Sequence, residues 1–196
     1  MKKITLLISA ALLSLVNTAH AGIFNFTGNI EFHNDVIFTH FTVESDATNV
    51  RVWTDSFMSA TNFDPITALW AADGTLIAQN DDNDDINPST QTYYDSGFAL
   101  PTLAAGDYIF SVATFDNWAT STNLADGFIF DTQTPIVLSE WNQPANHLNM
   151  GSFWSVWVDG VDRAVNDDAT NVPEPSSLIL LGLSLLAFGF RKVKQA

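Results

Sequence analysis

The chain of 196 residues contains no cysteine. Disulfides, thiolate metal ligands and a cysteine nucleophile are therefore excluded. Small exported proteins often rely on disulfides for stability. Here stability must come from burial of apolar side chains, with bound cations as a second source.

Basic side chains are scarce, since 7 Lys and Arg residues stand against 22 Asp and Glu, a formal net charge of −15. Five of the seven lie at the two ends of the chain: Lys2, Lys3, Arg191, Lys192 and Lys194. Without these five residues and Glu174, the central segment carries about −19, and its only Arg or Lys residues are Arg51 and Arg163. Such a surface repels nucleic acid and attracts divalent cations, so we expect no nucleic-acid partner.

Common catalytic motifs are also absent. The sequence has no H-E-x-x-H, no G-x-S-x-G and no glycine-rich phosphate loop. The central segment has three histidines, His33, His40 and His147, and we expect a structural role for His40 because it lies within a predicted strand. Carboxylates are plentiful enough to form a glycosidase pair. The sequence therefore predicts a protein that is not an enzyme, with a secreted carbohydrate-active hydrolase as the alternative.

Residues 1–21 have the three zones of a secretory signal peptide. Lys2 and Lys3 form a charged start, residues 4–16 are apolar, and Ala19-His20-Ala21 is a small-x-small cleavage site. Cleavage between Ala21 and Gly22 would make Gly22 the first residue of the exported protein.

Residues 173–196 also divide into three zones. Pro173 and Pro175 favour an extended backbone, which cannot form part of a helix. Residues 178–190 are almost entirely apolar and are predicted to form a helix of about 20 Å, short for a hydrocarbon core of about 30 Å. A basic end follows at once: Arg191, Lys192 and Lys194. Basic residues stay on the cytoplasmic side, so the preceding chain is expected to face away from the cytoplasm.

This order of zones over residues 172–194 resembles the PEP-CTERM sorting signal of Gram-negative bacteria. The motif residues are Pro173, Glu174 and Pro175, and Val193 interrupts the basic cluster of the family pattern. The resemblance implies an exosortase-type enzyme that recognises the motif at the inner membrane and cuts near it. It also implies delivery to the cell surface or to an exopolysaccharide matrix. A permanent membrane anchor is the alternative that the same zones allow.

Residues 22–164 are predicted to form one all-β domain, followed by a polar linker over residues 165–172. Short runs of β-branched and aromatic residues are separated by turn residues. The predicted strands cover residues 23–27, 35–43, 48–55, 66–72, 75–79, 91–100, 107–115, 127–130 and 152–158. About nine short strands at this spacing favour a single β-sandwich or jelly roll.

Period-2 alternation assigns faces within these strands. Val50 and Val52 share one face, and Arg51 and Trp53 share the other. Asp73-Gly74 between two apolar runs predicts a tight hairpin.

Several pieces of residues 35–128 resemble bacterial pre-peptidase C-terminal domains. They are Phe63-Asp64-Pro65, Asp73-Gly74, Asn80-Asp81-Asp82 and Leu103-x-x-Gly106-x-Tyr108. The resemblance implies a non-catalytic jelly roll that acts as an accessory or binding module outside the cell. Beyond Phe130 no resemblance is found.

The acidic stretch over residues 80–85 is the strongest candidate site. Calcium takes six to eight oxygen ligands, and Asp81, Asn83 and Asp85 have the alternate spacing of the first half of a calcium loop. Ile86 stands where an EF-hand needs glycine, so no EF-hand is predicted. We predict a calcium site of Asp64, Asp81, Asn83 and Asp85, with Asp64 brought near by the hairpin. A solvated acidic loop is the alternative.

The six tryptophans suggest a surface for sugars, because exposed indole rings stack on sugar rings. Trp70 lies in an apolar strand and is expected in the core, whereas Trp118 and Trp141 lie in polar loops. Sugar binding by these rings, with exopolysaccharide as the partner, is one hypothesis, and burial of the rings in the core of the sandwich is the alternative.

Overall fold

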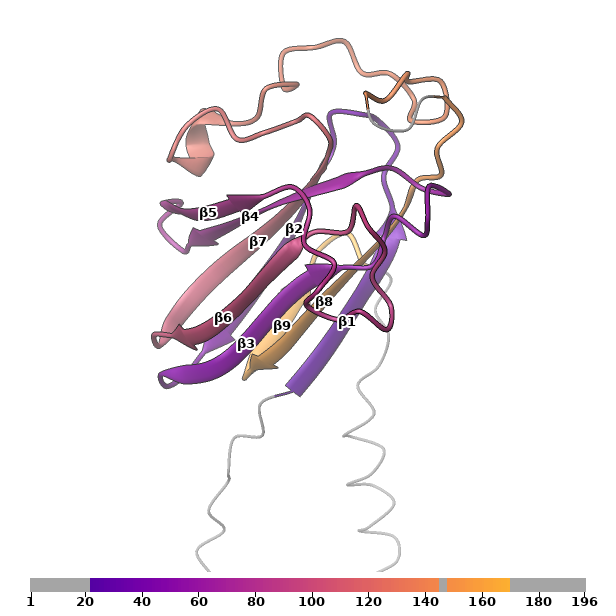
Figure 1. Cartoon of the computed structure of the whole chain (residues 1–196). Helices are drawn as coiled ribbons and strands as arrows, with labels where there is room; N and C mark the ends of the chain where they lie inside the picture. Colours follow the sequence, from indigo (N-terminus) through magenta and orange to yellow (C-terminus); the bar gives the residue numbers. More distant parts are fainter. Residues whose placement is uncertain (1–21, 145–147, 170–196) are drawn as a thin grey trace, which may run out of the picture.

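The computed structural model describes residues 22–144 and 148–169. These residues form nine strands and one short 3-10 helix, arranged as two antiparallel sheets that face each other (Figure 1). The predicted all-β sandwich is confirmed. The predicted signal peptide, the predicted hydrophobic helix over residues 178–190 and His147 lie outside the described residues.

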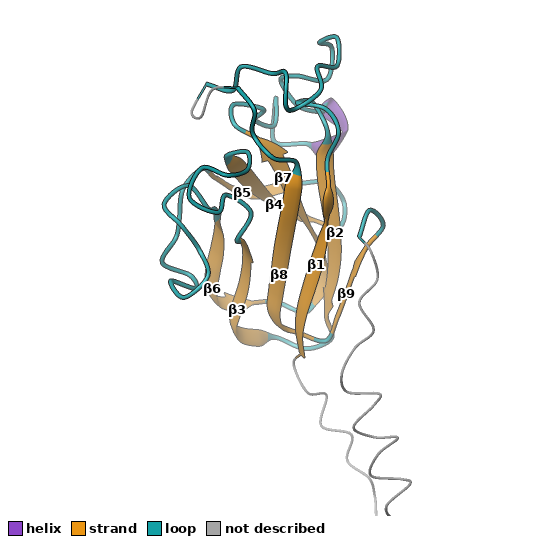
Figure 2. Ribbon diagram, turned by 90° about the vertical axis from the view of Figure 1, so that its right-hand side faces the viewer, coloured by secondary structure: helices purple, strands orange, loops and turns teal. Residues whose placement is uncertain are grey.

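One sheet has four strands in the order β1-β8-β3-β6, and the other has five in the order β5-β4-β7-β2-β9 (Figure 2). The bounds of the first sheet are β1 Gly22–Asn29, β8 Phe153–Val161, β3 Ala47–Thr54 and β6 Gly97–Leu103. Those of the second are β5 Leu76–Asn80, β4 Pro65–Ala71, β7 Gly106–Thr114, β2 Val36–Val43 and β9 Arg163–Asn166. The 3-10 helix η1, Leu124–Asp126, lies in the long connection between β7 and β8.

The main core fills the space between the two sheets. β3 contributes Val50 and Val52, while β7 contributes Phe110 and Val112, and all four are at most 1% exposed. Val50 and Val52 share a face as their alternation predicts. Each fully buried side chain of this size stabilises the fold by about 1.5–3 kcal/mol, so the period-2 pattern fixes the register of the strands.

Both sheets are also covered on parts of their outer faces. Trp70 and Phe128 form a second cluster outside the five-stranded sheet, beneath the β7–β8 connection. On the four-stranded sheet, Trp53 stacks on Trp157 with ring centroids 5.8 Å apart and is completely buried. The Arg51 guanidinium donates a hydrogen bond to the Ile86 carbonyl, which fastens the acidic loop over this face.

Two predicted strands differ from the structure, and side-chain hydrogen bonds explain both differences. Residues 91–96 are not strand, because the Asp95 carboxylate accepts the Thr92 backbone N–H (2.8 Å) and closes a turn. Residues 127–130 make only an isolated bridge, because the Asp131 carboxylate accepts the Phe128 N–H. The ninth strand is instead β9, which extends the sheet to Asn166 and so into the segment predicted as linker.

Candidate metal centre

The β4–β5 hairpin brings the two acidic segments of the candidate site to one end of the sheet. Asp64 immediately precedes β4, and Asp81 and Asp82 immediately follow β5. Thr67 near the start of β4 pairs with Asn80 at the end of β5. The predicted Asp73-Gly74 turn closes the hairpin, and Gly74 adopts φ 86°, a conformation that glycine reaches without strain.

Three carboxylates meet at this point. One oxygen from each of Asp64, Asp81 and Asp82 lies within 4.8 Å of the other two. Two oxygens bound to the same calcium ion at 2.3–2.6 Å can be at most about 5 Å apart. The spacing of the three carboxylates therefore suits a single cation of that size.

Asp64 is the buried member of the cluster. It is 3% exposed, and its Oδ1 has no hydrogen-bond partner among the described residues. The backbone around it is well anchored, since the Asp64 carbonyl accepts hydrogen bonds from the Phe115 N–H and the Gln143 side-chain amide. Asp81 Oδ1 is likewise buried without a described partner. Burying a carboxylate oxygen without a partner is costly, so both oxygens require compensation by a proton, a water molecule or a cation.

The electrostatics of the cluster also favour binding of a cation. Burial, with the nearby carboxylates of Asp81, Asp82 and Asp95, raises the pKa of Asp64 to about 8. Burial and the Asp82 and Asp116 carboxylates raise the pKa of Asp81 to about 6. The pKa of Asp82 is raised by burial and then by the Asp84 carboxylate.

No basic side chain among the described residues neutralises these charges. Arg51 pairs with Asp159 on the four-stranded sheet, and Arg163 pairs with Glu44 near the end of β2. The negative charge of the three carboxylates can be compensated by protonation or by binding of a divalent cation.

Of the three predicted carboxylate ligands, Asp64, Asp81 and Asp85, the structure brings two together and adds one. Asp64 and Asp81 are in the cluster, and Asp82 is the third member although alternate spacing would have skipped it. Alternate ligand positions belong to a calcium loop of the EF-hand type, whereas here the chain bends at Asp81, directly after β5, and two consecutive carboxylates reach Asp64. Asp85 is exposed and is not one of the three. The backbone N–H of Asn83 donates to the Asp95 carbonyl, and Asn83 as a side-chain ligand stays a prediction.

Asp95, which the sequence did not single out, organises the loop beside the cluster. Its Oδ1 accepts from the Phe57 N–H (3.0 Å) and the Thr54 hydroxyl (3.1 Å), and its Oδ2 from the N–H and hydroxyl of Thr92. These bonds occupy both oxygens, so Asp95 adds negative charge near Asp64 without offering a free ligand. A Thr-x-x-Asp spacing is its only local signal.

The donor set suits a hard cation. Calcium prefers carboxylate oxygen, whereas zinc prefers sulfur and nitrogen. His33 is fully buried, and both of its ring nitrogens are engaged, one with the Gln133 side chain and one with the Ile136 N–H. Three carboxylates supply three to six oxygens, and water or carbonyl groups can complete the six to eight that calcium takes.

The C-terminal segment provides the match to known proteins. Residues 171–194 match the PEP-CTERM protein-sorting motif. The motif supports a secreted protein that is anchored in the membrane as a precursor and processed by an exosortase. The predicted cleavage pair Ala21 and Gly22 spans the start of the described region, and the sorting and basic-end residues lie outside it.

No curated protein and no solved structure shows significant similarity to the chain. The resemblance to pre-peptidase C-terminal domains therefore stays a prediction. Within residues 22–144 and 148–169, none of the helical structure is long and apolar enough to cross a membrane.

Proposed function

We propose that the exported domain is a non-catalytic binding or structural module of the cell surface or the exopolysaccharide matrix, stabilised by one calcium ion. Asp64, Asp81 and Asp82 would hold the ion. The observation that carries this proposal is the buried Asp64 oxygen that has no described partner and lies within 4.8 Å of two further carboxylates.

The cost of leaving the cluster unoccupied supports a cation. Two carboxylates about 4 Å apart repel each other by about 1 kcal/mol in water and by about 4 kcal/mol at the effective dielectric constant of a protein surface. A divalent ion replaces this repulsion by attraction to all three groups. The folded protein would therefore gain stability when calcium binds.

The position of the site explains how calcium could stiffen the domain. The ion would join the segment before β4 to the segment after β5. The Asp64 carbonyl also accepts hydrogen bonds from Phe115, just after β7, and from Gln143 in the long connection. Calcium would thus fix one end of the five-stranded sheet together with the loops packed on it.

Two carboxylates that line a surface cavity, Asp35 and Asp131, have structural roles. Asp35 and Asp131 line a cavity of about 470 Å³. Asp35 Oδ2 accepts the N–H groups of Glu31 and Phe32, and Asp131 Oδ2 accepts that of Phe128. These turn-closing bonds favour a non-catalytic domain over the alternative, a secreted carbohydrate-active hydrolase. Shortening of a candidate polysaccharide on incubation with the protein would favour the hydrolase.

Calcium titration of the full-length protein in detergent, after treatment with a chelator, tests the cation site. Calcium at 100 times its Kd stabilises a protein by about 2.7 kcal/mol, which should raise Tm by about 5–10 °C for a chain of this size. Asp81→Asn should abolish both this shift and the heat of binding, since it removes one of the three charges. Calorimetry and thermal unfolding provide the two measurements.

Asp85→Asn is the matched control, because it removes an equal charge from the same loop outside the three-carboxylate cluster. It should leave calcium binding nearly unchanged. The calcium site would be refuted by the absence of heat and of any Tm shift at millimolar calcium. The ligand assignment would be refuted if Asp85→Asn weakened binding as much as Asp81→Asn.

A further inference from the structure

The outer face of the five-stranded sheet has an open groove, distinct from the metal centre. Along β2, Phe41 is buried in the main core, whereas His40 is exposed on the opposite side. The side chains of β7 alternate in the same way, with Phe110 in the core and Ile109 on the outer side. A cavity of about 380 Å³ lies over β7, β2 and β9, within the range of small-ligand sites.

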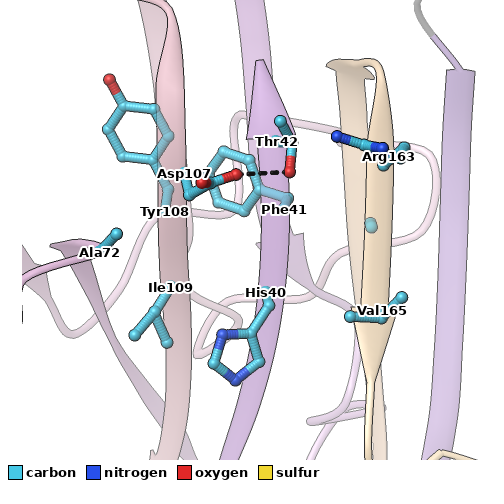
Figure 3. Close-up of a pocket in the computed structure, with 10 residues that line it drawn as sticks. His40, Phe41, Thr42, Ala72, Asp107, Tyr108, Ile109, Arg163 and Val165 are labelled. Carbon is cyan, nitrogen blue, oxygen red and sulfur yellow. Dashed lines mark hydrogen bonds between the residues drawn. The ribbon is translucent and has the colours of Figure 1, made fainter. Parts of the chain in front are cut away.

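The groove is lined by both apolar and polar side chains from β2, β7 and β9 (Figure 3). Ile109 and Val165 supply apolar surface, and Val165 is 58% exposed. The Thr42 hydroxyl donates to Asp107 Oδ1 at 2.7 Å, which holds that carboxylate at the edge of the groove. In Figure 3 the His40 ring lies beside Ile109, between β7 and β9. The sequence predicts a structural role for His40, yet its imidazole side chain makes no hydrogen bond with another described residue, and its backbone alone pairs with β7 and β9.

Arg163 is available to a ligand although it forms an ion pair. Its guanidinium lies 3.6 Å from Glu44, and the side chains are 69% and 57% exposed. Such a long, exposed pair contributes little, so a ligand can replace it at small cost. Arginine and carboxylate groups that flank an apolar surface suit a sugar ring, because paired hydroxyls can hydrogen-bond to both while the C–H face packs on the floor.

The negative charge of the domain favours a neutral polysaccharide over an anionic one. Arg163 offsets Asp107 within the groove, but the central segment carries about −19 and repels polyanions. A neutral chain rich in hydroxyls meets no such repulsion. We propose that this groove binds a neutral polysaccharide strand through His40, Asp107 and Arg163.

This inference rests on the proposed function for the choice of an exopolysaccharide partner, but it does not depend on calcium. The groove and the carboxylate cluster share no residue. The two proposals can therefore fail separately.

Affinity electrophoresis of the full-length protein in detergent tests the groove. The gels would contain a neutral glucan, a neutral mannan, a neutral galactan or polygalacturonate, each with calcium and with a chelator. At least one neutral polymer should retard the protein, and polygalacturonate should not. His40→Ala and Arg163→Ala should each weaken retardation about three- to tenfold, as expected for the loss of one hydrogen-bonding group, and the double variant should remove it.

Thr102→Ala is the control, because Thr102 is exposed on β6 of the other sheet and lines none of this cavity. It should bind like the unmodified protein, and circular dichroism should show that all variants are folded. The groove would be refuted if no neutral polymer retarded the protein or if the groove variants bound as well as the control. Retardation by polygalacturonate alone would refute the assignment to neutral sugars. Retardation that persists when calcium produces no Tm shift would refute the calcium site and leave this inference intact.

Discussion

At the scale of single residues, Asp64 combines properties that ordinary structural carboxylates avoid. It is buried, one of its oxygens lacks a described partner, and two further carboxylates are adjacent. Asp95 is also buried, yet its oxygens accept four hydrogen bonds, as a structural carboxylate requires. The contrast separates Asp95, whose oxygens hold a loop together, from Asp64, whose Oδ1 has no described hydrogen-bond partner.

The raised pKa of Asp64 predicts how stability depends on pH without calcium. Its pKa is about 8 in the folded protein against 3.8 ordinarily, so between about pH 4 and pH 8 the folded state holds a proton that the unfolded state has lost. The free energy of unfolding should therefore fall as pH rises through this window, by at most about 1.4 kcal/mol per pH unit. Asp81, with a pKa of about 6, adds to the fall between about pH 4 and pH 6.

Denaturant midpoints at pH 5, 6, 7 and 8 in the presence of a chelator measure this effect. Asp64→Asn should flatten the dependence above pH 6, because the amide does not titrate. Saturating calcium should also flatten it, since the cation competes with the proton. A stability that rises from pH 5 to pH 8 in the chelator would contradict the expected protonation of Asp64.

At the scale of elements, the fold depends on places where one backbone passes close to another. Gly97 begins β6 directly opposite Trp53 of β3 and adopts φ 153°. A Cβ at this position would lie 2.6 Å from the Trp53 Cα, closer than backbone atoms approach. Glycine is therefore required for β6 to pair with β3.

Gly97→Ala should lower the free energy of unfolding by about 2–4 kcal/mol, because the new methyl group must push two strands apart. Gly106→Ala is a suitable comparison: it also begins a strand, but its added Cβ would meet only the Tyr108 ring, at 3.6 Å or more. That variant should change stability by less than about 1 kcal/mol. Urea unfolding measures both, and equal effects would show that the close approach to β3 is unimportant.

At the scale of the whole molecule, the chain combines an acidic sandwich with a C-terminal sorting segment. The PEP-CTERM match begins at residue 171, shortly after β9 ends at Asn166. The sorting segment therefore joins the domain through a very short connection. Processing at this segment would separate the anionic domain from the hydrophobic and basic end of the chain.

Replacing Pro173, Glu174 and Pro175 together by alanine should block this processing. In a host with an exosortase, the unmodified protein should be shortened at its C-terminus and leave the inner membrane. The variant should remain there at the length left by signal-peptide cleavage, as shown by fractionation and intact mass. Glu140→Ala, which removes one exposed carboxylate of the domain, should be processed normally. Equal processing of both variants would show that the tripeptide is not the recognised element.

The sequence by itself determined the class of fold and the targeting segment. The alternation in β3, where Val50 and Val52 point inward and Arg51 points outward, is a local property of the sequence. Successive side chains along a strand point to opposite faces whatever the rest of the fold. The sorting motif is equally local and is confirmed by the match over residues 171–194.

Only the tertiary structure decided which carboxylates meet and which faces stay open. Asp82 joined Asp64 because the chain bends after β5 and a hairpin pairs distant residues, and no local spacing encodes that bend. Residues 91–96 of the predicted strand over residues 91–100 form a turn instead, because Asp95 bonds to Thr92 within the turn and also to Thr54 and Phe57, far away in sequence. Periodicity reports on neighbours along the chain, whereas sites are made by contacts between segments that the fold brings together.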